Sequence, residues 1–356
     1  MKVLDGLYDY LLSLGIRLME NGYIPDAVIR FFSRSLIAQT LSENSAGGTE
    51  KEVERLNSMV KQLKAMPIAI KTGDANEQHY EVPTEFFLKC LGPHLKYSCC
   101  LYTEPNMSLG QAEEAMLESY LEKSGVEDGM SILDLGCGWG SLSLFLAQRL
   151  PNAKVTSLSN SATQRAHIMS EAKERGISNL QVFTGDIRSF DDFKPSSFDR
   201  IFSIEMFEHM KNYELLLGKL SKWLKAEGKL FVHIFSHKTH CYHYEVKSEG
   251  DWMTKYFFEG GTMPSHDLLL HFQKHLRIDK TWRINGMHYA KTSRHWLNLM
   301  DQHKQRILSL FSEPSAYGKD AYKWFVRWRV FYIAVEEFFA FKEGEEWGVS
   351  MYLFKK

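Results

Sequence analysis

A glycine-rich turn constrains the fold of this chain more than any other feature. The run Asp134-Leu135-Gly136-Cys137-Gly138-Trp139-Gly140 follows a short apolar stretch and precedes an apolar helical pattern over residues 141–150. A strand, a glycine turn and a helix in this order are the context in which a glycine motif indicates a nucleotide site. Glycine lets the backbone adopt positive φ and pass close to a ligand, while the helix N-terminus offers free N–H groups. The sequence therefore predicts a nucleotide-like cofactor at this turn.

The spacing of the glycines narrows the class of cofactor. The pattern G-x-G-x-G differs from the G-x-G-x-x-G of dinucleotide folds, and the G-K-[ST] of a P-loop is missing. The pattern D-x-G-x-G-x-G resembles the first motif of S-adenosylmethionine (SAM) methyltransferases. A purely structural turn is the alternative, but it leaves Asp134 at a strand end without a function. We therefore predict SAM as the cofactor, with Asp134, Gly136, Gly138 and Gly140 among its binding residues.

Composition excludes several other classes of protein. The 356 residues are 44% hydrophobic and 24% charged, with a formal net charge of -1, so no overall field favours nucleic acid or an anionic membrane. No apolar run reaches the roughly 18 residues of a transmembrane helix, and the first 20 residues do not resemble a secretory signal. The five cysteines form no C-x-x-C pair, which favours reduced thiols. We expect a cytoplasmic enzyme with no nucleic-acid partner and no stable membrane association.

Alternating strand and helix patterns predict an α/β fold with a parallel sheet covered by helices on both faces. Strands are expected at residues 132–135, 154–158, 180–183, 198–204, 229–235, 276–285 and 347–354. We predict four segments: a helical N-terminal cap that covers the cofactor (1–125), a SAM-binding core (126–236), an inserted substrate lid (237–275) and final strands with a helical substrate-pocket insertion (276–356). Within the cap, Asp26 is expected to cap an amphipathic helix. The lid is inferred because a connection of that length is usually functional.

Each predicted strand end contributes polar residues to one edge of the sheet, where ligands bind in such folds. After the second strand, Asn160 and Gln164 replace the acid that commonly binds ribose hydroxyls, and an amide can do the same. After the third strand, Asp186 is placed to accept a hydrogen bond from the adenine amino group. The fourth strand leads into Glu205-Met206-Phe207-Glu208-His209, the candidate reactive segment. A helix-capping or surface role is the alternative for these two carboxylates and imidazole.

Several motifs together resemble the plant coclaurine N-methyltransferase group. They are Gln78-His79-Tyr80-Glu81-Val82-Pro83, Lys96-Tyr97-Ser98-Cys99-Cys100, the glycine turn, Phe207-Glu208-His209-Met210-Lys211-Asn212-Tyr213-Glu214, His237-Lys238-Thr239 and Gly344-Glu345-Glu346-Trp347. That group contains benzylisoquinoline, protoberberine and phenylalkylamine N-methyltransferases of plant specialised metabolism. It belongs to a superfamily with the cyclopropane-fatty-acyl-phospholipid synthases. The resemblance extends from about residue 50 to the end of the sequence.

The resemblance implies a class I SAM-methyltransferase fold, a Rossmann-like seven-stranded sheet, and roles for individual residues. The implied catalytic residues are Glu205, Glu208 and His209. The expected cofactor contacts beyond the glycine turn are Tyr97, Ser98, Asn160, Gln164, Asp186, Ile187 and Ile204. The expected substrate-pocket residues are Tyr80, Phe258, Tyr289, Trp328, Phe331 and Tyr332. The implied function is N-methylation of a small aromatic amine in alkaloid biosynthesis, and a homodimer is compatible with it.

The chemistry of amine methylation agrees with these roles. An alkylamine is mostly protonated at neutral pH and then has no lone pair with which to attack a methyl group. His209 or Glu208 is the expected base, because histidine titrates near neutrality and a neighbouring carboxylate raises its basicity. Glu205 is expected to hold the ammonium form. The aromatic cluster over residues 324–339 is expected to bind the cation through its π faces, at ~0.5–2 kcal/mol per contact.

A lipid-modifying enzyme is the first alternative to this interpretation. The cyclopropane synthases hold a bicarbonate ion with a Cys, a Glu, a His and a Tyr, and the resemblance places Cys99, Glu208, His233 and Tyr322 at the matching positions. Phe235 replaces the isoleucine usual two residues after that histidine, and the C-terminal Gly-Glu-Glu-Trp is typical of the amine group. These two differences favour amine methylation.

Two further alternatives receive less support from the sequence. A non-catalytic SAM-binding protein conflicts with the intact set Glu205, Glu208 and His209. A metal site at His237, His240, Cys241 and His243 does not have zinc-motif spacing, and direct methyl transfer needs no metal. We therefore expect no metal cofactor.

Overall fold

The computed structural model describes residues 2–70 and 82–356. Its main feature is a seven-stranded sheet of order β3-β2-β1-β4-β5-β9-β8, which confirms the predicted α/β class. The strands are β1 (Ser131–Leu135), β2 (Lys154–Ser159), β3 (Leu180–Thr184), β4 (Phe198–Ile204), β5 (Leu224–His237), β8 (Arg277–Asn285) and β9 (Trp347–Lys355). Strands β1 to β5 run parallel, whereas β9 lies antiparallel between β5 and β8.

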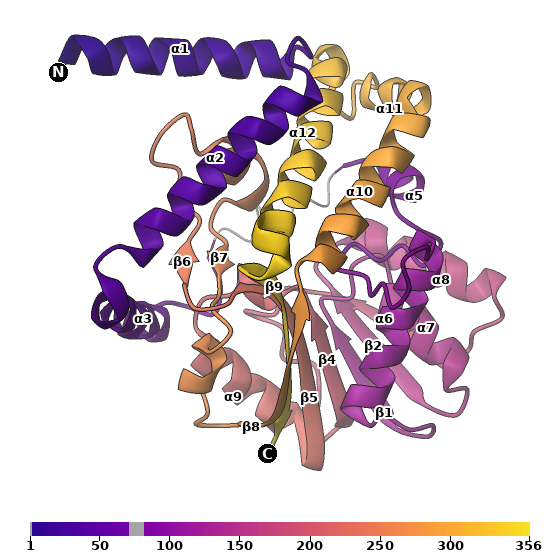
Figure 1. Ribbon diagram of the computed structural model, residues 1–356. Coiled ribbons are helices and arrows are strands. Elements are labelled where there is room, and N and C mark those ends of the chain that lie inside the picture. Colours follow the sequence, from indigo (N-terminus) through magenta and orange to yellow (C-terminus); the bar gives the residue numbers. More distant parts are fainter. Residues whose placement is uncertain (1, 71–81) are drawn as a thin grey trace.

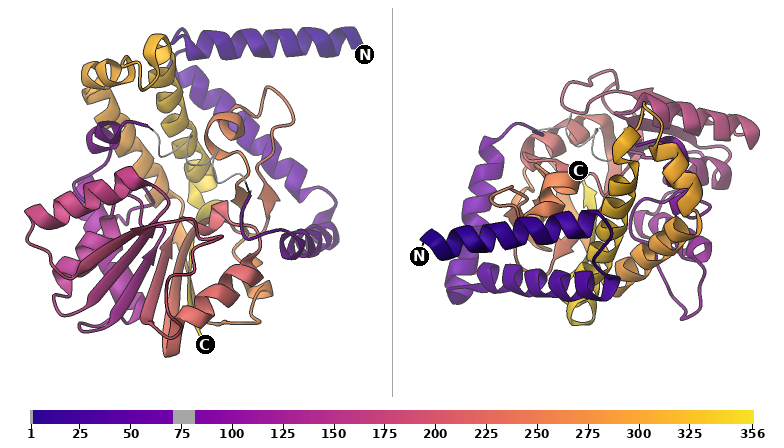
Figure 2. Two further views of the ribbon diagram at one scale, coloured as in Figure 1. Left: turned by 180° about the vertical axis from the view of Figure 1, so that it is seen from behind. Right: turned by 90° about the horizontal axis from the view of Figure 1, so that it is seen from above.

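Helices cover both faces of the sheet, as the sequence predicts (Figures 1 and 2). Neighbouring strand residues point to opposite faces, so Ile132 packs into one hydrophobic core and Leu133 into the other. The first core includes α6 (Leu109–Ser124), α7 (Ser141–Arg149) and α8 (Ala162–Glu174). The second includes α3 (Gly48–Ala65) and α9 (Tyr213–Trp223). The sheet is therefore buried on both sides, and its carboxyl edge is left for ligands.

A layer of helices stands above that carboxyl edge (Figure 1). It consists of α1 (Lys2–Glu20), α2 (Asp26–Ser45), α5 (Thr84–Cys90), α10 (Met287–Gln302), α11 (Lys304–Phe311) and α12 (Ala321–Ala340). The short elements are η1 (Phe207–His209), β6 (Tyr242–His243), the π-helix η2 (Thr254–Phe258), β7 (Thr262–Met263), η3 (Leu268–His271), η4 (Gly318–Asp320) and η5 (Phe341–Gly344). None of the described helices is long and apolar enough to cross a membrane.

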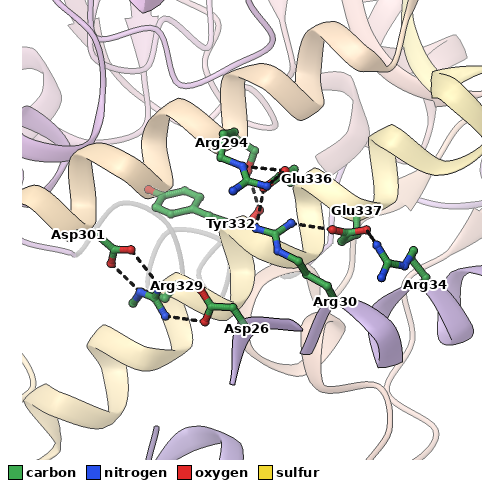
Figure 3. Close-up of polar contacts among 10 residues, drawn as sticks. Asp26, Arg30, Arg34, Arg294, Asp301, Arg329, Tyr332, Glu336 and Glu337 are labelled. Carbon is green, nitrogen blue, oxygen red and sulfur yellow. Dashed lines mark hydrogen bonds and ion pairs between the residues drawn. The ribbon is translucent and has the colours of Figure 1, made fainter. Parts of the chain in front are cut away.

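Ion pairs attach α2 to α12, as Figure 3 shows. Arg30 binds Glu336 at 3.0 Å and Glu337 at 2.6 Å. Asp26 binds Arg329 at 3.0 Å. The prediction that Asp26 caps α2 is therefore wrong, because Pro25 occupies the cap position and makes no side-chain cap bond. Instead, the Arg329 guanidinium donates two hydrogen bonds to the Asp26 carboxylate across the interface between the helices.

One predicted strand changes in length. β5 is longer at both ends than the predicted run 229–235. The extra residues of β5 pair with β4 at Leu224 and with β9 as far as His237. Pairing with two neighbours therefore extends the strand beyond its apolar run. The four-segment division of the chain stays a proposal.

Candidate active site

A cavity opens at the carboxyl ends of β1, β2, β3 and β4. Ten of the predicted cofactor residues line it: Tyr97, Ser98, Asp134, Gly136, Gly138, Asn160, Gln164, Asp186, Ile187 and Ile204. Two predicted reactive residues, Glu205 and His209, line the same cavity. The parallel strands thus bring together segments more than 100 residues apart in the sequence.

The glycines of the turn have different surroundings, although all three have positive φ. A Cβ built on Gly138 meets no atom within 4 Å, and this residue borders the cavity. A Cβ on Gly140 would lie 2.6 Å from Ile168 Cγ1 of α8. Gly140 is also not among the described residues that line the cavity. Gly140 allows the turn to pack closely on α8, and its role as a cofactor residue stays a prediction.

Asp134 has a partner inside the protein. Its carboxylate is buried and accepts a hydrogen bond of 2.6 Å from Ser143 Oγ on α7. Burial raises the Asp134 pKa to about 6, and the Ser143 hydrogen bond opposes that shift. The Ser143 hydrogen bond gives Asp134 a partner inside the protein and leaves further acceptor positions of the carboxylate, so its role in cofactor binding stays a prediction. The residue anchors the end of β1 to α7 and also borders the cavity.

Besides the Ser141 hydroxyl, two buried N–H donors in the cavity have no hydrogen-bond partner among the described residues. They are Gln164 Nε2 and Trp139 Nε1. The other end of the Gln164 amide, Oε1, accepts a hydrogen bond of 2.7 Å from Ser159 Oγ. Buried donors are rarely left unsatisfied, so both atoms indicate a ligand that carries acceptors. Sequence reasoning missed Trp139, although it stands inside the glycine motif.

The predicted adenine contact, Asp186, lies at the β3 side of the cavity. Its carboxylate accepts hydrogen bonds from Arg188, at 2.8 Å from Nε and 2.6 Å from Nη2. The backbone N–H of Arg188 also donates to Asp186. These three bonds orient the Asp186 carboxylate at the edge of the cavity.

Glu205 is a buried carboxylate held by three donors. Its Oε1 accepts from the Cys99 N–H and from His233 Nε2, each at 3.0 Å, and its Oε2 accepts from the Tyr289 hydroxyl at 2.6 Å. Burial alone would raise the Glu205 pKa, but the His233 hydrogen bond and the Lys96 charge outweigh it and lower that pKa. The backbone of Glu205 has φ of 49°, an uncommon value for a residue with a side chain. The cavity therefore contains a fixed, ionised carboxylate.

His209 and Glu208 are neighbours with different environments. Burial lowers the His209 pKa to about 4, the Lys211 charge adds to this shift, and Glu205 opposes it. The expectation that His209 titrates near neutrality is thus wrong, since desolvation exceeds the effect of the carboxylate. Glu208 Oε1 accepts from the Phe235 N–H at 2.7 Å, and burial raises its pKa well above the usual range. Glu208 is not among the described cavity-lining residues.

The predicted substrate residues lie in two places. Tyr289 reaches Glu205, and its ring stacks on Phe339 at 4.2 Å between centroids. The rest form an aromatic cluster around Phe257 that lies outside the set of described cavity-lining residues: Phe258, Trp328, Phe331 and Tyr332. Trp328 and Tyr332 are fully buried, and their role in the substrate pocket stays a prediction. Tyr80 lies outside the described residues.

Comparisons with known proteins agree on one family. A family model described as mycolic acid cyclopropane synthetase matches residues 69–328. An (S)-coclaurine N-methyltransferase from Thalictrum flavum subsp. glaucum is 38% identical over 344 residues, covering 96% of this chain and 95% of that protein. A crystal structure of a coclaurine N-methyltransferase bound to N-methylheliamine and S-adenosylhomocysteine (SAH) has a TM-score of 0.90 at 34% identity. It covers 98% of this chain and 99% of the other. The chain belongs to the coclaurine N-methyltransferase family.

Membership of the coclaurine N-methyltransferase family confirms the predicted resemblance and the assignment to SAM-dependent N-methyltransferases. A pavine N-methyltransferase from the same plant is 34% identical over 343 residues, covering 96% of each chain. The family model also confirms the wider superfamily with the cyclopropane synthases.

In this family member, the residues suggested for a bicarbonate site are arranged differently from that expectation. Cys99 and His233 both hold Glu205, as described above, and not Glu208. Tyr322 is 47% exposed, and its hydroxyl packs against Gly22 beyond the end of α1. The expected four-residue set is therefore incorrect, because the Glu205 carboxylate already takes the donors that an anion would use.

The predicted lid, residues 237–275, is tied to the reactive segment by Lys211. This buried ammonium donates to Gly261 O at 3.0 Å and to Thr262 Oγ1 at 2.7 Å, and it lies 3.0 Å from His243 Nδ1. Glu259 and Gly260 of the same segment line the cavity. One lysine thus positions the lid residues next to His209.

The histidines at the start of the lid form a packed junction. His237 stacks on His240 with ring centroids 4.5 Å apart, and its Nδ1 accepts from the N–H groups of Thr239 and His240. Within residues 2–70 and 82–356, no group of three or more His, Cys, Asp or Glu side chains could hold a metal ion. These contacts give the histidines a structural role.

Proposed function

We propose that the chain transfers a methyl group from SAM to the nitrogen of a small aromatic alkylamine or alkaloid, of phenylalkylamine or tetrahydroisoquinoline type. The single observation that carries this proposal is the pairing of an ionised Glu205 with a neutral His209 at one cavity. A carboxylate binds a cationic amine, and an uncharged imidazole can accept its proton. The names of the relatives, coclaurine and pavine N-methyltransferase, support this class of substrate.

The residues present fit the cofactor. Gln164 Nε2 and Trp139 Nε1 offer donors that lack a protein partner in the described part of the chain, and Gly138 leaves room for a bulky group. Asn160, Gln164 and Asp186 would hold the nucleoside, and Ser98 would contact the amino-acid part. When bound, SAM supplies an electrophilic methyl group. The protein then contributes by aligning the amine nitrogen with that methyl group.

Glu205 would bind the substrate ammonium and align its nitrogen. Tyr289, His233 and the Cys99 backbone hold the carboxylate in one orientation. A charge that is held before the substrate arrives needs little reorganisation during the reaction. The position of the amine would therefore be determined by residues from β4, β5 and α10.

His209 would take the proton from the bound ammonium. With its pKa near 4, the imidazole is uncharged at physiological pH. Transfer of the proton to His209 leaves a neutral amine next to an anionic Glu205, and that carboxylate stabilises the imidazolium. Glu208 would act indirectly, because it is not among the described cavity-lining residues and its carboxyl group accepts a hydrogen bond from the Phe235 N–H.

Cyclopropane synthesis on unsaturated lipid is the alternative function, and the arrangement of Glu205 disfavours it. A bound bicarbonate would need the Cys99 and His233 donors that Glu205 uses. Purified protein should therefore be given SAM with phenylalkylamines, tetrahydroisoquinolines or unsaturated phospholipids, and SAH formation measured. We expect turnover and a methylated product with amines only. Turnover on lipid that disappears when bicarbonate is removed would overturn the proposal.

Location and assembly complete the proposed function. We propose a cytoplasmic enzyme, and the five cysteines, all described and all free thiols, are compatible with a reducing compartment. A homodimer stays a prediction, which analytical ultracentrifugation would test.

A further inference from the structure

Lys96 is a buried lysine that the proposed function leaves without a role. It is 2% exposed and lines the cavity next to Tyr97 and Ser98. Its Nζ donates to Ser98 Oγ at 2.5 Å and lies 5.3 Å from the centroid of the Tyr120 ring. An ammonium has three donors, and within the described part of the chain only one is used. No carboxylate among those residues forms an ion pair with it.

Acidic side chains outnumber basic ones in the described lining of the cavity. Its described lining contains four acidic side chains, those of Asp134, Asp186, Glu205 and Glu259, and Lys96 is the only lysine or arginine among them. A buried charge without an ion-pair partner is costly, and is retained where a ligand supplies the counter-charge. Asp134, Asp186 and Glu205 already accept hydrogen bonds from other groups. Lys96 is thus available to an anionic group of a ligand.

The position of Lys96 in the cavity indicates which part of a bound ligand it would contact. Tyr120, which lies under the ammonium, binds His233 of β5 at 2.9 Å. Asn160 and Asp186 follow β2 and β3, on the other side of β1 in the sheet. Glu205 follows β4 between these two groups. The nucleoside residues and Lys96 therefore lie at opposite sides of the cavity.

We propose that Lys96 binds the α-carboxylate of the amino-acid part of SAM. The inference rests on the proposed function, because it takes the cofactor from there. The carboxylate is the only anionic group of SAM, and a charge-assisted hydrogen bond from a buried ammonium would fix that end of the molecule. Ser98, already bound to Lys96, would share the same group. Lys96 is then a binding residue that positions the cofactor for transfer.

A purely structural role is the competing explanation. Lys96 lies near Glu113, whose carboxyl group accepts the Lys96 backbone N–H at 3.2 Å. Burial raises the Glu113 pKa to about 7, and the Lys96 charge opposes that shift, as it opposes the effect of burial on the Glu205 pKa. A lysine that only balances these carboxylates would affect every ligand of the cavity alike. A lysine that binds the cofactor carboxylate would affect only ligands that have one.

Calorimetric titration with SAH and with its decarboxylated analogue, S-adenosyl-3-thiopropylamine, separates the two explanations. We expect the wild type to bind SAH about 10- to 100-fold more tightly than the analogue. In Lys96→Met, SAH affinity should fall by about that factor, while analogue affinity changes less than about threefold. Lys96→Arg should keep part of the preference, and Lys89→Met, at a half-buried lysine of α5 that is not among the described cavity-lining residues, should keep all of it.

If Lys96→Met lost affinity for SAH and for the analogue by the same factor, the proposal would be overturned in favour of the structural role. Retained binding of the analogue shows that the variant is folded. If the variant does not fold, the wild type still decides, since equal affinity for SAH and the analogue would exclude a carboxylate contact. A wild type that binds neither ligand would instead contradict the proposed function.

Discussion

Gly138 and Gly140 offer a direct test of which part of the turn faces the cofactor. Gly138→Ala places a side chain at a position of positive φ, so it should cost about 1–2 kcal/mol of stability. Its methyl group also enters the cavity, so the affinity for SAH should fall at least about tenfold. Gly140→Ala adds a collision with Ile168 and should cost about 2–5 kcal/mol. Urea unfolding and calorimetry measure both quantities. Unchanged SAH affinity in Gly138→Ala would contradict the placement of the cofactor.

Glu205 occupies a backbone position that suits glycine, so its side chain can be removed with little strain. Glu205→Gly should lower kcat by about 10²–10⁴-fold. It also leaves the Cys99 N–H, His233 and Tyr289 without their acceptor. Added formate or acetate should therefore restore part of the turnover. Initial rates against formate concentration measure the rescue.

Glu205→Gln is the matched control for this rescue, because its amide fills the space that formate would enter. The Gln variant should have a low turnover rate that does not rise when formate is added. If formate rescued neither variant, the three donors would not form an anion site, and the assignment of Glu205 as their fixed carboxylate would fail.

The lowered pKa of His209 determines how activity depends on pH. Its protonated form accumulates only as the pH falls through about 4, so the base is fully available well above that value. Because the proposed reaction starts from the bound ammonium, the acidic limb of kcat/KM should lie near pH 4, and its alkaline limb should follow the pKa of the amine. Two amines whose pKa values differ by about 2 should shift the alkaline limb by the same amount.

His209→Ala should lower the plateau of that profile by about 10²–10⁴-fold and leave the position of the alkaline limb unchanged. An acidic limb that lies near pH 6.5 for both amines, and that disappears in His209→Ala, would show that the histidine titrates near its ordinary value.

At the scale of elements, Lys211 attaches the lid to the reactive segment. Lys211→Met removes its bonds to Gly261 and Thr262. Amide hydrogen exchange over residues 242–263 should become at least about tenfold faster, while β1 and β4 stay protected. Lys247→Met is the control, since this lid lysine is 76% exposed and pairs only with Glu245. Equal exchange in both variants would show that aromatic packing alone holds the lid.

The ion pairs between α2 and α12 should stabilise the protein more than surface pairs do. Arg30 and Glu337 have side chains only 14% and 10% exposed, so Glu337→Gln should cost about 1–3 kcal/mol. A double-mutant cycle with Arg30→Met, followed by urea unfolding, measures their coupling. The exposed pair Lys51–Glu54 on α3 should give less than about 0.5 kcal/mol. Similar values for both pairs would assign α2 docking to its apolar contacts.

At the scale of the whole molecule, apolar runs predicted the strands well, because a buried parallel strand has few polar positions. The expected run 198–204 coincides with β4. The location of β9 between β5 and β8 could not be predicted in this way. Strand pairing depends on distant partners, and the local sequence of β9 does not contain that information.

The candidate site was predictable where residues follow a strand directly, as Asp134, Asp186 and Glu205 do. The sequence could not show that His209 faces the cavity while its neighbour Glu208 binds the Phe235 N–H, because one residue changes direction on a short 3₁₀ turn. Lys96 and Trp139 were missed although both stand inside the quoted motifs, because a motif does not show which of its side chains are buried beside a cavity. Burial turns an ordinary lysine into a candidate ligand, and burial is a property of the fold.

The position of β9 imposes an order on synthesis. β8 pairs within the sheet only through β9, which is made about 60 residues later, and a ribosome adding 5–20 residues per second needs ~3–12 s for that interval. Until then, β8 and the free edge of β5 are exposed on a nascent chain. Both are open to chaperones and to pairing with other chains. The yield of folded protein in a host cell should therefore depend on translation speed between β8 and β9.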